Sequence, residues 1–140
     1  MPQLIQHIDA IARKKQRDVL FVLFGPPGRD DLLSDYDYDY EADVRRREII
    51  AWLDKHRISW LPCGEYASTS GYSAYDGRIY IDVPYDEPDA TYRLVRDYLE
   101  NPDGTNRYDD ARFCYLPLEK AMENAHHDEP GFWERWAEDF

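Results

Sequence analysis

Two short apolar runs constrain the fold of this chain most strongly. Residues 19–24 (VLFVLF) are apolar at every position, which is typical of a central strand covered on both faces. Residues 78–83 (RIYIDV) are the second strong strand candidate. Two weaker candidates accompany them: residues 59–67, which contain Pro62, and residues 112–116, which end at a proline. Because proline cannot donate a backbone hydrogen bond, the weaker strands are expected at the edges of a sheet.

The spacing of apolar residues predicts three helices around these strands. They are residues 3–16, residues 42–56 with Val44 facing the core, and a helix that opens at Pro88 and buries Leu94. The order strand-helix-strand-strand-helix-strand is the split β-α-β arrangement called ferredoxin-like. We therefore expect a single α+β domain over residues 1–140. It has a four-stranded antiparallel sheet of order 4-1-3-2, an extra N-terminal helix and a C-terminal helical tail.

The apolar first strand requires a cover on the sheet face opposite the second and third helices. The helix over residues 3–16 and the C-terminal tail are favoured for this role, and a second subunit is the alternative. Cys63 and Cys114 fall on opposite edges of the predicted sheet, too far apart for a disulfide, so both are expected to be reduced.

The charge of the chain limits its partners. It carries 29 acidic and 17 basic residues, a formal charge of −12. This charge repels nucleic-acid phosphates and anionic lipids and favours basic partners or cations, so direct nucleic-acid binding is not expected. No apolar run is long enough to span a bilayer, and the N-terminal helix lacks the basic start of a secretory signal. We expect a cytoplasmic protein that makes no membrane contact.

An acidic segment follows the first strand. Seven carboxylates fall within residues 30–43, and tyrosines alternate with them in the second half. Rigid aromatic groups beside negative charge are suited to binding a Lys/Arg-rich protein surface. The residues expected to contact the partner are Asp35, Tyr36, Asp37, Tyr38, Asp39, Tyr40 and Glu41. Two alternatives remain open: Asp39 or Asp43 caps the following helix, or the arginines at 45–47 neutralise the segment.

Two motif comparisons bear on this region. Residues 22–28 (VLFGPPG) resemble the opening of the P-loop of AAA-type ATPases, but residues 29–31 (RDD) replace the Gly-Lys-Ser/Thr that binds phosphate and magnesium. The run from Asp35 resembles the start of an EF-hand calcium loop. Its sixth position, which requires glycine, is Tyr40, and its twelfth, which requires glutamate, is Arg46. Neither motif is therefore complete.

These patterns favour a binding protein over an enzyme. We assign no catalytic residue, no metal ligand and no cofactor. The leading hypothesis is a small acidic binding or inhibitory protein, like an immunity protein or a nucleic-acid mimic, that engages a basic protein partner through the Asp/Tyr-rich segment. One alternative is a metal-dependent or small-ligand enzyme that uses the same carboxylates. Another is a structural homodimeric subunit.

Overall fold

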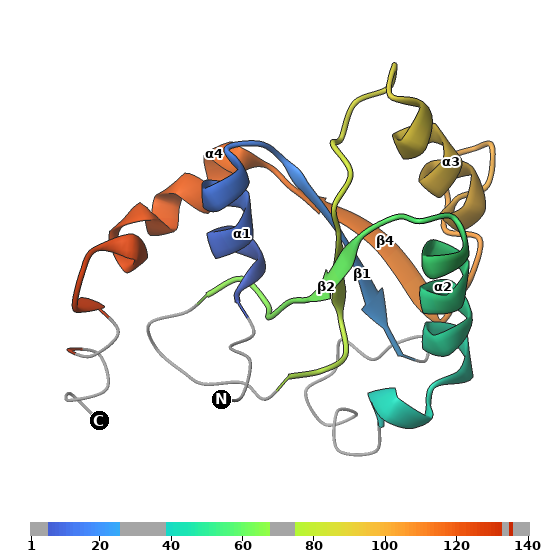
Figure 1. Ribbon diagram of the computed structural model, residues 1–140, viewed down its shortest axis with the longest axis horizontal. Coiled ribbons are helices and arrows are strands. Elements are labelled where there is room, and N and C mark those ends of the chain that lie inside the picture. Colours follow the sequence, from blue (N-terminus) through green and yellow to red (C-terminus); the bar gives the residue numbers. More distant parts are fainter. Residues whose placement is uncertain (1–5, 26–38, 68–74, 133–134, 136–140) are drawn as a thin grey trace.

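The computed structural model describes residues 6–25, 39–67, 75–132 and 135 (Figure 1). Within these residues the elements are, in chain order, α1 (Ile8–Lys15), β1 (Val19–Phe24), the 3-10 helix η2 (Tyr40–Ala42), α2 (Val44–Lys55), β2 (Trp60–Pro62), β3 (Ile79–Ile81), α3 (Ala90–Leu99), β4 (Ala111–Leu116), α4 (Leu118–Ala121) and the 3-10 helix η3 (Met122–Asp128). None of these helices has the length and apolar character that crossing a membrane requires.

The four strands form one antiparallel sheet in the order β2-β3-β1-β4. This confirms the predicted order 4-1-3-2, read from the opposite edge. The two strongly apolar strands pair at the centre, with Leu20 opposite Ile81 and Phe21 opposite Tyr80. Pro62 lies in the edge strand β2, as expected for a residue that lacks a backbone N–H.

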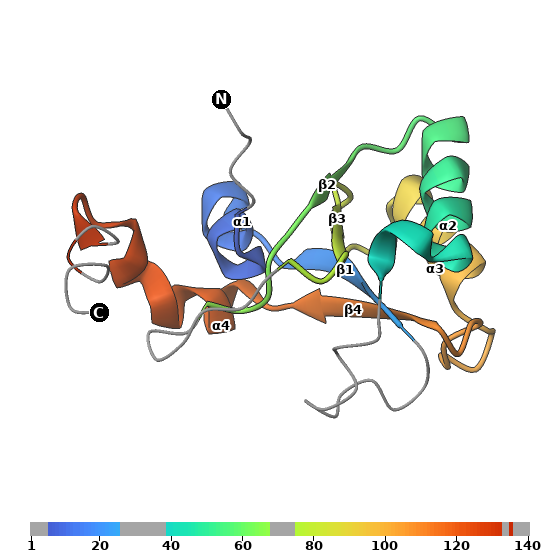
Figure 2. The ribbon, with the colours of Figure 1, turned by 90° about the horizontal axis from the view of Figure 1, so that it is seen from below.

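One face of the sheet packs against α2 and α3, which lie together in Figures 1 and 2. Leu20, Val22 and Phe24 point to this side, because successive residues of a strand face opposite ways. The helix residues that complete this core are Ile49, Leu53, Tyr92, Val95 and Leu99. Each of these side chains is at most 3% exposed, and burying one contributes roughly 1.5–3 kcal/mol.

The opposite face is covered by α1 and by α4 at the start of the tail (Figure 1). Ile8 and Ile11 of α1 pack in one cluster with Val19 and Tyr80 of the sheet, and Ala121 of α4 joins it. This confirms that the first helix and the beginning of the tail cover the face opposite α2 and α3.

A polar network that is buried at Asp9 and Arg13 and exposed at Asp128 joins α1 to η3. Arg13 donates to Asp9 at 2.9 Å and makes two hydrogen bonds to Asp128, at 2.7 and 2.9 Å. The fully buried Asp9 also accepts from the backbone N–H of Ala67 at 2.9 Å and from Asn124 at 3.0 Å. Burial alone would raise the pKa of Asp9, but the hydrogen bonds from these three residues lower it. The carboxylate therefore stays ionised and fixes the tail on the N-terminal helix.

The second strand is shorter than the predicted 59–67. After β2 ends, the backbone of Gly64 pairs with the chain before α1: its N–H donates to Gln6 at 2.8 Å, and its carbonyl accepts from Ile8 at 3.1 Å. Residues 68–74 lie outside the described residues. The pairing with the N-terminal segment is a long-range contact, which the local strand pattern does not contain.

Two side chains predicted to face the core are exposed instead. Val44 is 72% exposed and Leu94 is 43% exposed. The buried residues of α2 are Ile49 and Leu53, and Val44 lies about 140° around the helix from Ile49. Leu94 is similarly displaced from the buried stripe of α3. The α3 helix also begins two residues after Pro88, because Asp89 caps it by accepting the N–H of Tyr92 at 2.8 Å.

Candidate functional site

The described part of the Asp/Tyr-rich segment begins at Asp39, and its carboxylates cap helices. Asp39 accepts the N–H of Glu41 at 3.0 Å and is the N-cap of η2. Asp43 accepts the N–H of Arg46 at 3.2 Å and is the N-cap of α2. Each cap satisfies an N–H that has no partner within its helix, and such a cap is typically worth about 1 kcal/mol. The capping role predicted as one alternative is thus confirmed for Asp43, whereas Asp39 caps the 3-10 helix η2, which was not predicted.

Tyr40 packs against the turn that precedes β3. Its ring lies 4.9 Å from the ring of Tyr75 in an edge-to-face contact, and the Arg46 guanidinium lies 5.0 Å from its centre. Gly77 permits this approach, since a Cβ there would overlap the Cβ of Tyr40 and lie 2.8 Å from its Cγ. Arg46 also donates to the carbonyl of Gly77 at 2.8 Å. Tyr40 therefore anchors the segment to the body of the protein.

The three arginines that follow the segment bind several different groups. Arg45 pairs with Glu48 at 2.8 Å and with Asp110 at 3.0 Å, and its guanidinium lies 4.0 Å from the centre of the Tyr108 ring. Arg47 donates to the backbone carbonyl of Glu41 at 2.7 Å. Among the described residues, the carboxylates paired with Arg45 thus lie outside the Asp/Tyr-rich segment. The side chains of Asp39 and Glu41 are exposed.

Gly25 and Asp39, the two residues to which residues 26–38 are attached, lie at the same end of the sheet. At the end of β1, the N–H of Gly25 donates to the carbonyl of Asp110 at 3.1 Å, and at the other attachment point Asp39 precedes η2. Asp109 and Asp110 come directly before β4, whose first residue pairs with the last residue of β1. We call Asp39, Glu41, Asp109 and Asp110 the acidic end. Asp109 and Asp110 were not predicted as site residues, although their position before the last strand places them beside the end of the first one.

The residues predicted to contact a partner are only partly described. Asp35, Tyr36, Asp37 and Tyr38 lie outside the described residues. The described members are Asp39, Tyr40 and Glu41, of which the first and the last have exposed side chains and Tyr40 is half-buried. In the described part of the chain, no group of three or more His, Cys, Asp or Glu side chains is arranged to hold a metal ion. The run from Asp35 that resembles a calcium loop falls mostly outside that part.

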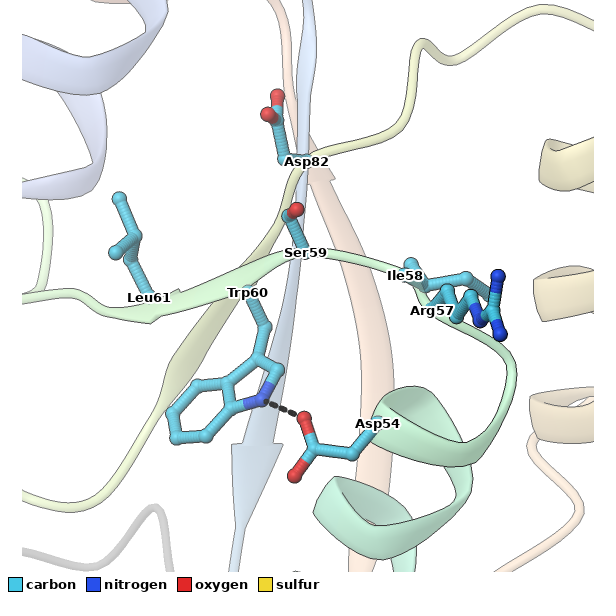
Figure 3. Close-up of a pocket in the computed structure, with 7 residues that line it drawn as sticks. All are labelled: Asp54, Arg57, Ile58, Ser59, Trp60, Leu61 and Asp82. Atoms are coloured by element: carbon cyan, nitrogen blue, oxygen red, sulfur yellow. Dashed lines mark hydrogen bonds between the residues drawn. The ribbon is translucent and has the colours of Figure 1, made fainter.

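A second candidate is an open depression at the start of β2 (Figure 3), with a volume of about 550 Å³. It is lined by Asp54, Arg57, Ile58, Ser59, Trp60, Leu61 and Asp82. The indole N–H of Trp60 donates to Asp54 at 2.9 Å. Arg57 has a φ of +58°, in the left-handed region. The depression is thus bordered by both acidic and basic groups.

Asp82, at the rim of this depression, is already held by its neighbours. It accepts from the phenol of Tyr80 at 2.7 Å and from Arg17 at 2.8 Å, and Lys15 lies 3.5 Å away. Burial would raise the pKa of Asp82, but the hydrogen bond from Tyr80 and the two cations lower it. Burial, followed by the bond to Asp82, raises the pKa of Tyr80 to about 12. The cluster ties the end of α1 to β3 and leaves both groups poorly suited to proton transfer near neutral pH.

Both cysteines are free thiols. Cys63 follows β2 and Cys114 lies in β4, on opposite edges of the sheet as predicted. Cys63 is fully buried, and burial raises the pKa of its thiol to about 12. Because the thiolate is the reactive form, this burial makes Cys63 a poor nucleophile at neutral pH.

Comparison with known proteins gives no assignment: no family model, no curated protein and no solved structure matches the chain.

Proposed function

We propose that this chain is a small binding or inhibitory protein whose acidic end engages a basic protein partner. The observation that supports the proposal most directly is the position of the two attachment points of residues 26–38. Both lie at the end of the sheet where Asp39, Glu41 and Asp109 are exposed. The described carboxylates therefore border the segment that carries the other acids.

The concentration of charge supports the same proposal. Residues 30–43 contain seven acidic residues and no basic residue, in a chain with a net charge of −12. A surface of one sign attracts partners of the opposite sign, accelerates their encounter and repels those of like charge. A basic protein is therefore the class of partner that this segment favours.

The anchoring of Tyr40 gives the segment a defined starting point. Tyr40 is held by Gly77, Tyr75 and Arg46, and the caps at Asp39 and Asp43 fix the helix that follows. Fixing a binding segment before it meets its partner lowers the entropy cost of association. In this proposal Asp35, Tyr36, Asp37, Tyr38, Asp39 and Glu41 contact the partner, and Tyr40 positions them.

We also propose that the strands form a ferredoxin-like arrangement with α2 and α3. The antiparallel order β2-β3-β1-β4 supports this, as does the packing of both helices against one face. In such an arrangement the connection from β1 to α2 leaves the sheet at one end, where the acidic segment is joined.

The experiment is a capture of binding proteins from an extract of the source cells, followed by affinity measurements on the purified partner. The test variant is Asp35→Asn/Asp37→Asn/Asp39→Asn, in which asparagine preserves the cap at position 39. The matched control removes the same charge from three exposed residues elsewhere, Glu65→Gln/Glu119→Gln/Glu129→Gln. We expect a basic partner whose affinity falls by about tenfold or more in the test variant and declines with added salt.

Two results would contradict the proposal. One is a set of captured proteins that are acidic. The other is an equal loss of affinity in the test and control variants, since that would reflect net charge alone and not the acidic segment. Both variants are checked for folding by circular dichroism before binding is measured.

A further inference from the structure

The outer edge of β4 is partly covered by the chain before it. The N–H of Phe113 donates to the side chain of Asn106 at 2.9 Å, so it points away from β1. Backbone groups alternate in direction along a strand, so the N–H and carbonyl of Ala111 and Tyr115 also point outward. Ala111 forms a bridge with Tyr108. Tyr115 has no such partner among the described residues, and its backbone donor and acceptor remain open.

The other edge of the sheet is less suited to pairing. Directly after β2, the N–H of Cys63 donates inward to the carbonyl of Arg78 at 3.2 Å, so the backbone of Pro62 faces outward. Proline has no N–H to offer an added strand, and β2 is only three residues long. Tyr115 in β4 is therefore the better position for an added strand.

Two exposed tyrosines lie beside this open position. Tyr115 is 51% exposed and Tyr85 is 43% exposed, and their ring centres are 4.8 Å apart. The buried ring of Tyr92 lies 5.3 Å from Tyr85. Tyr115 is opposite Leu20, whose side chain faces α2 and α3, so this pair of rings lies on the same face. We call Tyr85 and Tyr115 the tyrosine pair.

Elsewhere the protein places its own cations over tyrosine rings. These contacts are Arg46 over Tyr40, Lys120 over Tyr66, Arg96 over Tyr92 and Arg45 over Tyr108. No Lys or Arg among the described residues takes this position over Tyr85 or Tyr115. The faces of the tyrosine pair are thus available to a cation from another molecule, and such contacts are worth about 0.5–2 kcal/mol.

The carboxylates around Tyr92, the buried neighbour of Tyr85, favour a cation on this side of the protein. The pKa of Tyr92 is raised to about 12, first by burial, then by Tyr85 and by the carboxylates of Glu87 and Glu100. Burial raises the pKa of Glu100; Arg96 lowers it, and Glu87 raises it by less. Glu87 and Glu100 each affect the pKa of Tyr92 more than Arg96 does, so the carboxylates outweigh this cation at the Tyr92 phenol.

We propose that the β4 edge at Tyr115 docks an extended segment of a partner protein, with an arginine or lysine opposite Tyr115. In an antiparallel pair, directly opposite residues place their side chains on the same face about 5 Å apart. The cationic side chain then lies over the tyrosine pair, and the backbone of its residue exchanges two hydrogen bonds with Tyr115. Tyr115 pairs with Leu20, which lies five residues before Gly25. Five residues of a strand span about 17 Å, so this surface lies that far from the acidic end and does not depend on it.

The test is a titration of the isotope-labelled chain with a defined seven-residue peptide, Thr-Val-Thr-Arg-Thr-Val-Thr, blocked at both ends. NMR amide shifts report where it binds. We expect the largest shifts at Tyr115 and at its neighbours in β4, with affinity about fivefold weaker when neutral citrulline replaces arginine. N-methylation of the arginine backbone nitrogen removes one of the two hydrogen bonds and is expected to weaken binding at least as much.

A matched pair of variants separates the tyrosine pair from exposed apolar surface in general. Tyr85→Ala should weaken binding, whereas Leu94→Ala, at a side chain that is also 43% exposed, should leave it unchanged. Absence of binding at about 1 mM peptide, or equal affinity for the arginine and citrulline peptides, overturns the proposal. So do shifts confined to residues 39–43, although these would agree with the proposed function. A dimer in light scattering, together with Tyr115 amide shifts that change with protein concentration, would assign the edge to a second copy and also overturn the proposal.

Discussion

The turn at Gly77 allows a sharp test of how the acidic segment is anchored. Gly77 has a φ of +95°, and Tyr40 packs directly on it. Gly104 has a similar φ of +88°, but no atom lies within 4 Å of the position that a Cβ would take there. Replacing each glycine by alanine therefore imposes the same kind of backbone strain at both sites and adds a steric overlap only at Gly77.

The expected costs follow from these contacts. Alanine in the left-handed region loses about 1–2 kcal/mol at either position. At Gly77 the added Cβ would also lie 2.8 Å from the Cγ of Tyr40, so the ring has to move. Moving it removes the contacts of Tyr40 with Tyr75 and Arg46, each worth about 0.5–1 kcal/mol. We expect Gly77→Ala to lower the free energy of unfolding by about 2–4 kcal/mol and Gly104→Ala by about 1–2 kcal/mol.

Urea unfolding followed by tryptophan fluorescence measures the difference. With a denaturant dependence of about 1.5 kcal/mol per molar, the two midpoints should differ by about 0.7–1.3 M. In a chain that already carries Tyr40→Gly, the additional cost of Gly77→Ala should fall to the value for Gly104→Ala. Equal midpoints for the two single variants would show that Tyr40 does not pack on the turn, and the anchor described for the segment would be wrong.

Three further outcomes are expected. Burial, followed by His126, lowers the pKa of His127 below 6.5 in the folded chain, so the free energy of unfolding should fall as the pH drops below about 6.5. Urea unfolding midpoints at several pH values measure this decline. The control variant His127→Phe should remove it. Arg13→Met leaves the buried Asp9 carboxylate without its cation and should lower the free energy of unfolding by about 3–5 kcal/mol in urea titrations, whereas a loss under about 1 kcal/mol would argue against the network. Cys63 should resist alkylation at pH near 8 until the chain unfolds, and mass spectrometry of labelled peptides would detect any earlier reaction.

The arrangement of the sheet could be predicted because two local signals agree. The uniform hydrophobicity of residues 19–24 indicates burial on both faces, and Pro62 indicates an edge. These signals place β1 inside and β2 outside, as the structure has them. Helix faces were less predictable: Val44 and Leu94 fit an apolar spacing, but which stripe is buried depends on the angle at which each helix meets the sheet.

The acidic end was only partly predictable for a related reason. The carboxylates that precede α2 are visible in the sequence as caps, because a cap acts on backbone groups two or three residues away. The packing of Tyr40 on Gly77 spans 37 residues, and the approach of Asp110 to Gly25 spans 85. Contacts of this length depend on the whole topology and leave no mark in the local pattern. The tyrosine pair of Tyr85 and Tyr115 belongs to the same class.

Ion pairs within the molecule account for part of its basic charge. Several arginines are engaged within the molecule: Arg13 with Asp9 and Asp128, Arg17 with Asp82, Arg45 with Asp110 and Glu48, Arg78 with Asp76, and Arg96 with Glu87 and Asp97. Each such pair cancels charge locally and fixes one element against another. These five arginines engage eight carboxylates, so three of the 12 excess negative charges belong to these groups and the other nine to residues outside them. Asp39 and Glu41 are among the exposed acids of the described chain. If the proposed function is correct, a basic partner meets those groups first, because a screened interaction acts over about 8–10 Å and reaches beyond direct contact.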